Sequence, residues 1–128
     1  MNIIELLAIA RKVDNYENDP VAGLKVLWTS TTVFQATCPA GKRWFLLGGY
    51  IDRDVAATCV VRIRDSAANF LRSLSDAAAS TVRIPLIENE FAQTGIFILD
   101  PGDYVHVYFG VAQGAAAFAS CQVLEVDI

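Results

Sequence analysis

The sequence predicts an all-β fold, a jelly-roll type of β-sandwich with about eight antiparallel strands, preceded by a short helical or extended arm. Two observations predict it. Beyond residue 24, short runs of β-branched and aromatic residues alternate with turn residues, at intervals of roughly ten residues. Residues 1–24 instead combine a helical pattern with a polar stretch. We therefore expect an arm over residues 1–24 and a sandwich domain over residues 25–128.

The arm has the pattern of a short amphipathic helix followed by a linker. Asn2 and Glu5 have the spacing of a helix-capping pair, and Ile3 and Leu7 fall on one helical face. Residues 14–20 are polar and end in a proline, which stops a helix. Such an arm either folds back on its own domain or docks on a neighbouring subunit, and the sequence leaves both open.

The first part of the sandwich is predicted by two apolar stretches and the turn between them. Lys25 to Thr37 is rich in valine, threonine and aromatic residues, which favours one long or broken strand. Pro39 to Lys42 is a turn. Trp44 to Ile51 is the next strand, and its Gly48-Gly49 pair indicates a bulge or a close approach of the backbone.

The middle of the chain is less uniform. Thr58 to Arg64 alternates, with Cys59, Val61 and Ile63 on one face and basic residues on the other. Residues 65–80 also fit a helix, but we favour a strand over Asn69 to Ser75 with a turn of small residues after it. Thr81 to Ile87 is a strand interrupted by Pro85, which places it at a sheet edge.

The last strands are separated by a clear turn. Gly95 to Leu99 is a short apolar strand, and Asp100 to Asp103 is a tight turn in which proline and glycine supply the required backbone angles. Tyr104 to Val111 then alternates aromatic and apolar residues, with Tyr104, His106 and Tyr108 on one face. Ala119 to Ile128 is the final strand.

Composition excludes several classes of protein and indicates another. The chain of 128 residues carries 10 basic and 14 acidic residues, a net charge of −4, which argues against binding nucleic acid through phosphate contacts. No apolar run is long enough for a membrane-spanning helix. Counting glycine and omitting tyrosine, about 57% of the residues are apolar, against about 45–50% in soluble domains. We expect part of this surplus to lie in contacts with other chains.

Cysteine and histidine patterns give no support for catalysis or metal binding. The three cysteines, Cys38, Cys59 and Cys121, form no C-x-x-C pair, and an odd number favours reduced thiols and assembly in a cytosol. His106 is the single histidine, which excludes the usual zinc-ligand sets and leaves any Cys–His nucleophile pair dependent on it. We expect no enzyme activity, no metal and no cofactor.

Paired carboxylates are the remaining candidates for chemistry. Asp52 and Asp54, and likewise Glu88 and Glu90, stand two residues apart and could contribute to a calcium site on loops. The simpler interpretation is that these are solvated loop acids. Asp100 and Asp103 similarly fit a β-turn that selects acids for local hydrogen bonds.

Charge is unevenly distributed along the chain. Residues 1–64 hold 8 basic and 6 acidic side chains, net +2, whereas residues 65–128 hold 2 basic and 8 acidic side chains, net −6. Arg62 and Arg64 share one strand face. Unlike patches of this kind either meet between copies of the subunit or form ordinary solvated ion pairs.

Two turns carry a resemblance to a known family. One is Pro39-Ala40-Gly41-Lys42-Arg43-Trp44, which leads into an apolar strand, and the other is Leu99-Asp100-Pro101-Gly102-Asp103, which precedes a late strand. With their order and separation, the region of about residues 25–128 resembles tailed-phage capsid decoration (cement) proteins with a tumour-necrosis-factor-like jelly-roll fold. Each turn by itself is common among sandwich proteins.

The resemblance implies a structural role in a virus particle. Such a protein would assemble in the host cytoplasm, bind the outside of a phage head as a homotrimer, and stabilise it by bridging neighbouring capsomers of the major capsid protein. No nucleic acid or membrane partner is implied. In this setting we expect Ile3, Ile4 and Leu7 to dock the arm, and Trp28 and Trp44 to act as aromatic anchors if they are exposed.

Two other functions stay open from the sequence. One is a different virion component, such as a head fibre, tail or connector protein. The other is a carbohydrate-binding or receptor-binding sandwich that uses the row Tyr104, His106 and Tyr108.

Overall fold

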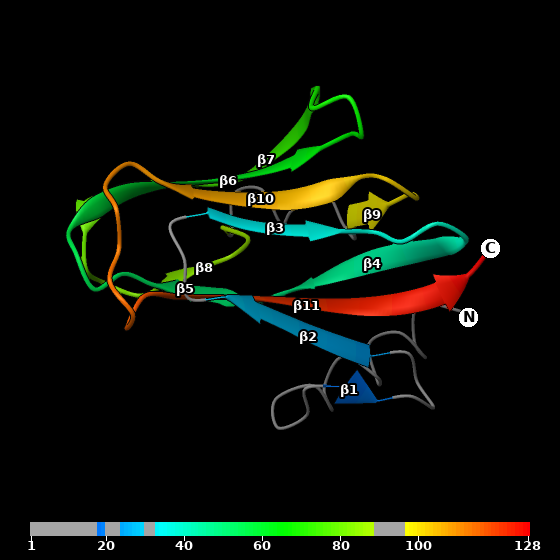
Figure 1. Cartoon of the computed structure of the whole chain (residues 1–128), viewed down its shortest axis with the longest axis horizontal. Helices are drawn as coiled ribbons and strands as arrows, with labels where there is room; N and C mark the ends of the chain where they lie inside the picture. Colours follow the sequence, from blue (N-terminus) through cyan, green and yellow to red (C-terminus); the bar gives the residue numbers. More distant parts are fainter. Residues whose placement is uncertain (1–17, 20–23, 30–32, 89–96) are drawn as a thin grey trace.

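The computed structural model describes residues 18–19, 24–29, 33–88 and 97–128, and these residues form strands, turns and loops with no helix. The strands pack as two layers in Figure 1. They are β1 (Asn18–Asp19), β2 (Leu24–Thr29), β3 (Val33–Thr37), β4 (Lys42–Gly48), β5 (Tyr50–Asp52), β6 (Ala57–Arg64), β7 (Phe70–Ser80), β8 (Ile84–Pro85), β9 (Phe97–Leu99), β10 (Tyr104–Phe109) and β11 (Phe118–Asp127).

The strand order is that of a jelly roll. One sheet has the order β1-β2-β11-β4-β9, with β5 paired to β11 and β8 paired to β5, and the other has the order β3-β10-β6-β7. Apart from β1, β5 and β8, the strands pair from the two ends of the chain inward. β2 pairs with β11, β3 with β10, β4 with β9, and β6 with β7. Successive pairs alternate between the two sheets, which is the double Greek-key connectivity of a jelly roll and confirms the predicted fold class.

The core lies between the two sheets and follows from the alternation of each strand. On β6 and β10 every second residue points inward, as shown by the buried Val61, Ile63, Val105 and Val107. A jelly roll needs one apolar face on each sheet, and the alternation of apolar residues along the strands provides that face. The buried cluster also includes Phe34, Ala36, Cys38, Trp44, Leu46, Ile51, Ala57, Cys59, Leu74, Leu86, Phe97, Leu99, Phe109, Ala119, Cys121 and Val123.

The segment predicted as one long or broken strand is broken, and its two parts belong to different sheets. β2 pairs with β11, whereas β3 pairs with β10. The alternating composition of Lys25 to Thr37 contains no signal for this change of sheet, because either half could pair with any strand of compatible pattern.

The Gly48-Gly49 pair divides the next predicted strand into β4 and β5. Both glycines have positive φ, 148° and 146°, which side chains rarely adopt. A Cβ placed on Gly49 would stand 2.1 Å from the backbone oxygen of Ser120. The register between β4 and β11 shifts at Gln122/Val123, opposite this point. The predicted bulge and close backbone approach are therefore both present.

The prediction for residues 69–80 was right in type and wrong in extent. β7 runs from Phe70 through the alanines to Ser80, so the small residues continue the strand and do not form a turn. Pairing with β6 explains this, because Ala77 lies opposite Cys59 and Ser80 opposite Ala57 in the register.

A buried arginine holds that end of the sandwich together. The guanidinium of Arg53, only 5% exposed, donates hydrogen bonds to the carbonyl oxygens of Ala57, Ala78 and Val82 at 2.6 to 2.8 Å. Three separate segments are thus fixed by one side chain. The strand predicted over Thr81 to Ile87 is only the two-residue β8, so its predicted length is wrong. Because β8 pairs only with β5 among the described strands, the predicted edge position of Pro85 is confirmed.

The two turns that carry the resemblance lie against each other. The backbone N–H of Cys38 donates to Asp103 at 2.9 Å, and that of Gly102 donates to Cys38 at 2.9 Å. Asp103 N–H closes the second turn onto Asp100, and Gly102 has the positive φ of 90° that this turn requires. The predicted helix over the first residues of the arm lies outside the described residues.

Candidate interaction surface

The outward face of the β3-β10-β6-β7 sheet carries a row of aromatic side chains. Tyr104, His106 and Tyr108 alternate with buried residues along β10, as the sequence predicted. Their rings are neighbours: the centroids of Tyr104 and His106 are 6.1 Å apart, edge to face, and those of His106 and Tyr108 are 6.4 Å apart. Tyr108 is 49% exposed. The row is therefore continuous and accessible.

A row of arginines lies next to the aromatic row on the same face. Arg64 is the register partner of Tyr104, and Arg62 is the partner of His106. The guanidinium of Arg62 donates to the carbonyl oxygen of Ser75 at 3.0 Å and lies 5.8 Å from the ring centroid of Phe70. These contacts fix the position of Arg62 before any partner binds.

Few opposite charges accompany these arginines. Among the described residues that register places on this face, Asp76 is the one carboxylate, and it lies 3.6 Å from the Arg62 guanidinium. Arg64 donates to the backbone oxygen of Ala68 at 3.0 Å. Burial and, secondly, the charge of Arg64 lower the pKa of His106, so its neutral form is favoured in the folded protein. The face is locally basic on an acidic chain.

The outward face of the other sheet carries an apolar row. Ile98 on β9, Phe45 on β4 and Leu124 on β11 are successive register partners, on the face opposite to the core residues Leu46 and Val123. Ile98 is 52% exposed, Phe45 is half-buried and Leu124 is buried. The same register reaches Leu24 on β2. Outward positions of a sandwich are normally polar, so this row is unusual.

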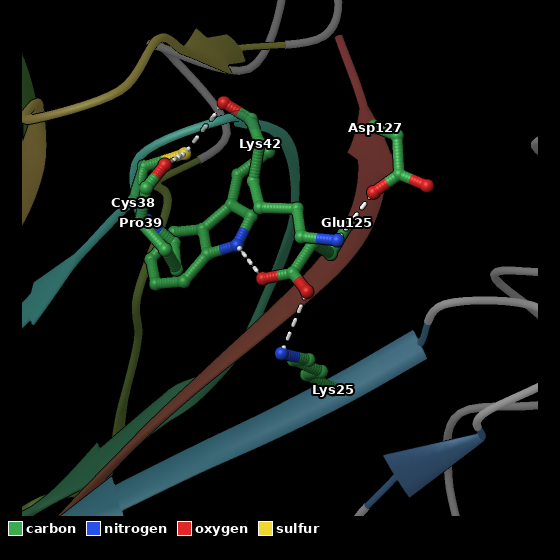
Figure 2. Close-up of polar contacts among 7 residues, drawn as sticks. Lys25, Cys38, Pro39, Lys42, Glu125 and Asp127 are labelled. Atoms are coloured by element: carbon green, nitrogen blue, oxygen red, sulfur yellow. Dashed lines mark hydrogen bonds and ion pairs between the residues drawn. The ribbon is translucent and has the colours of Figure 1, made fainter.

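Trp44 does not meet the condition for a surface anchor, because it is only 3% exposed and belongs to the core. Its indole N–H donates to Glu125 at 2.8 Å, and the Lys25 ammonium lies 2.8 Å from the other oxygen of that carboxylate (Figure 2). Lys42 pairs with Asp127 beside them. Trp44 and its neighbours therefore join β2, β4 and β11 from within.

The other predicted docking residues are not described. Trp28 lies on β2, but the position of its side chain is outside the description. Ile3, Ile4 and Leu7 lie outside the described residues altogether. Their roles remain predictions.

The cysteines do not form the reactive pair that a nucleophilic mechanism needs. Cys38, Cys59 and Cys121 are free thiols in the core, whereas His106 lies on the outward face of its sheet. Burial raises the pKa of Cys59 to about 11 and that of Cys121 to about 12, which keeps both thiols protonated at neutral pH. In the described structure these residues pack the core.

The described carboxylates of the predicted pairs are used in local contacts. Asp52 binds Arg83 through both oxygens at 2.7 and 2.8 Å. Asp54 accepts from the backbone N–H of Gly114 at 2.9 Å, and Glu88 accepts from the hydroxyl of Ser75 at 2.8 Å. Glu90 lies outside the description. No group of three potential metal ligands occurs among the residues that the structure describes.

The sequence did not reveal two parts of these surfaces. Phe70 lies beside Arg62 only because β7 pairs with β6, and the row of Ile98 and Phe45 forms only because β9 lies beside β4. Alternation along the strand was a usable signal for Ile98. Because side chains on a strand alternate between faces, Ile98 lies on the outer face when Phe97 and Leu99 are buried.

No family model matches the chain, and no curated protein matches it significantly. A solved crystal structure of a pentameric capsid protein isolated from metagenomic phage sequences is similar, with 13% identity and a TM-score of 0.43, over 99% of this chain and 76% of that one. Within the described part of the chain, no helix is both long and apolar enough to cross a membrane.

Proposed function

We propose that this protein is a capsid decoration (cement) protein of a tailed phage, which binds the outside of the head as a homotrimer and bridges neighbouring capsomers. The observation that carries the proposal is the pair Ile98 and Phe45 on an outward sheet face, where Ile98 is 52% exposed and Phe45 is half-buried. An apolar outer face on a sandwich this small is typical of a surface that another subunit covers.

Three further features support the proposal. The jelly roll is a common architecture of viral shell proteins. The two turns whose sequences resemble those of decoration proteins occupy one end of the sandwich together. The sequence is also richer in apolar residues than its core requires, and exposed apolar side chains include Phe70, Leu71 and Ile98.

The mechanism is physical and needs no chemical step. Three sandwiches bury their apolar faces against one another, and the arm, residues 1–24, reaches the shell or an adjacent trimer through Ile3, Ile4 and Leu7. A specific interface needs about 1,000 Å² or more of buried surface. Weak contacts become collectively strong because many identical copies bind one shell.

The first test is the native mass of the full chain in solution, measured by light scattering. We expect three times the subunit mass of 13.9 kDa, about 42 kDa. A monomer that stays monomeric at high concentration contradicts the trimer.

The second test uses the particles of the virus that encodes the chain. We expect binding in hundreds of copies per particle, on the order of the number of capsomer contacts. Deleting residues 1–20 should abolish that binding while the sandwich stays folded. A few copies per particle would instead identify a tail, connector or head-fibre component. Normal binding of the deletion variant would contradict the role of the arm.

A further inference from the structure

The outward face of the β3-β10-β6-β7 sheet presents two parallel rows of different chemistry. Tyr104, His106 and Tyr108 form the aromatic row on β10, and Arg62 and Arg64 form the cationic row on β6. Neighbouring strands are about 4.8 Å apart, and the aromatic row extends over about 13 Å of strand. A ligand that lies along β10 therefore touches both rows at once.

Charge on this face selects an anionic ligand. Among the described residues on the face, Arg62 and Arg64 stand beside a single carboxylate, Asp76, which pairs with Arg62 at 3.6 Å, and His106 adds a positive charge when it is protonated. Ser75 and Phe70 hold Arg62 in place, so little side-chain entropy is lost when a ligand binds. Guanidinium groups bind carboxylates with charge-assisted hydrogen bonds.

The aromatic row distinguishes between kinds of anionic ligand. An acidic peptide would satisfy the arginines but would leave the tyrosine rings without a matched partner. A sugar ring presents an apolar C–H face that stacks on an aromatic ring, and a uronic acid adds a carboxylate to the same unit. A polymer of acidic sugars therefore complements both rows.

We propose that this face binds an acidic polysaccharide, with sugar rings against Tyr104 and Tyr108 and carboxylates against Arg62 and Arg64. This site is on the opposite sheet from the apolar row and is independent of the decoration function. A particle protein with such a site would attach its shell to acidic glycans.

The test measures binding of the full-length protein to three probes: an oligogalacturonate, neutral dextran and poly-L-glutamate. We expect binding to the oligogalacturonate that weakens with salt, and at least about tenfold weaker binding to the other two. Lower pH should strengthen binding, because protonation of His106 adds a positive charge beside Arg62 and Arg64, and the other groups around it, Gln35, Tyr104 and Tyr108, stay neutral.

Variants separate the two rows. Tyr108→Ala and Arg64→Gln should each weaken oligogalacturonate binding about tenfold or more, whereas Arg83→Gln should leave it unchanged. Arg83 is a matched control because it also lies over a tyrosine ring, 4.3 Å from the centroid of Tyr50, but is paired with Asp52. Thermal melting verifies that each variant is folded.

Three results would overturn the proposal. Equal binding of poly-L-glutamate, unaffected by Tyr108→Ala, would show a general acidic-protein contact. Equal binding of dextran would show that the arginines play no part. Binding to none of the three probes would show that the face is not a glycan site, and the proposed decoration function would stand or fall separately on its particle test.

Discussion

Glu125 has an unusual environment for an acidic residue. It is an acid on an inward-facing position beside the core, and it accepts hydrogen bonds from Lys25 and from the Trp44 indole. Burial acts to raise the pKa of Glu125, but those hydrogen bonds and the charges of Lys25 and Lys42 outweigh it and lower the pKa below the usual 4.5. The charged form therefore stabilises the fold.

Replacing Glu125 by glutamine should lower the free energy of unfolding at neutral pH by about 1–3 kcal/mol, because two hydrogen bonds lose their charged acceptor. The stabilisation that Glu125 provides is fully present above the pKa that this residue has in the unfolded chain. It is lost as the pH falls through the lower pKa of Glu125 in the folded protein. Urea unfolding of both proteins at neutral pH and in acid measures this.

Asp127→Asn is the control for that experiment. Asp127 also pairs with a lysine, Lys42, but its side chain is 84% exposed, so solvent screens the pair. We expect no measurable change in stability. If both variants lost the same free energy of unfolding, the partly buried position of Glu125 would not be the reason for its stabilising effect.

At the scale of elements, the strands follow from alternation and the breaks follow from glycine and proline. Thr58 to Arg64 and Tyr104 to Val111 were predicted almost to their ends, because one face is apolar and the other is not. The alanines of β7 were missed, because small residues carry no preference strong enough to separate a strand from a turn. Their pairing with β6 decided the outcome.

The two adjacent glycines between β4 and β5 allow a matched test of why glycine is needed there. Gly48→Ala should cost about 1–2 kcal/mol of stability, because a Cβ at positive φ is strained but meets nothing within 4 Å. Gly49→Ala has nearly the same φ and in addition places the Cβ against the backbone of Ser120. Its loss should be larger by several kcal/mol.

Chemical denaturation of the two variants decides between strain and contact. If both alanine variants lose the same stability, the close approach of β5 to Ser120 has no energetic role. A Gly49→Ala protein that fails to fold, beside a folded Gly48→Ala protein, agrees with the expectation.

At the scale of the whole molecule, the two sheets present opposite chemistry to the outside. One outer face carries the apolar row that includes Ile98 and Phe45, and the other carries aromatic and basic side chains. Such an asymmetry suits a subunit that turns one sheet toward its own copies and the other toward solvent. The proposed trimer therefore depends on the first face.

Substituting Ile98 by serine should shift the native mass from trimer toward monomer while leaving the stability of the single chain nearly unchanged, because Ile98 is already half-exposed there. Val82→Ser is the control: Val82 is more exposed, at 68%, but lies in the connection between β7 and β8. Light scattering and thermal melting of both variants provide the measurement. Dissociation by Val82→Ser alone would place the subunit contact elsewhere.

The sequence by itself determined the fold class, most strands, the two turns and the aromatic row on β10. Each of these depends on neighbours within a few residues, such as Pro101 and Gly102 in one turn or the alternation around His106. Only the tertiary structure decided that Trp44 is buried against Glu125, that Phe70 lies over Arg62, and that Ile98 and Phe45 share a face. The physical reason is that such contacts join residues far apart in the chain, and strand order, which local patterns do not encode, selects which strands become neighbours.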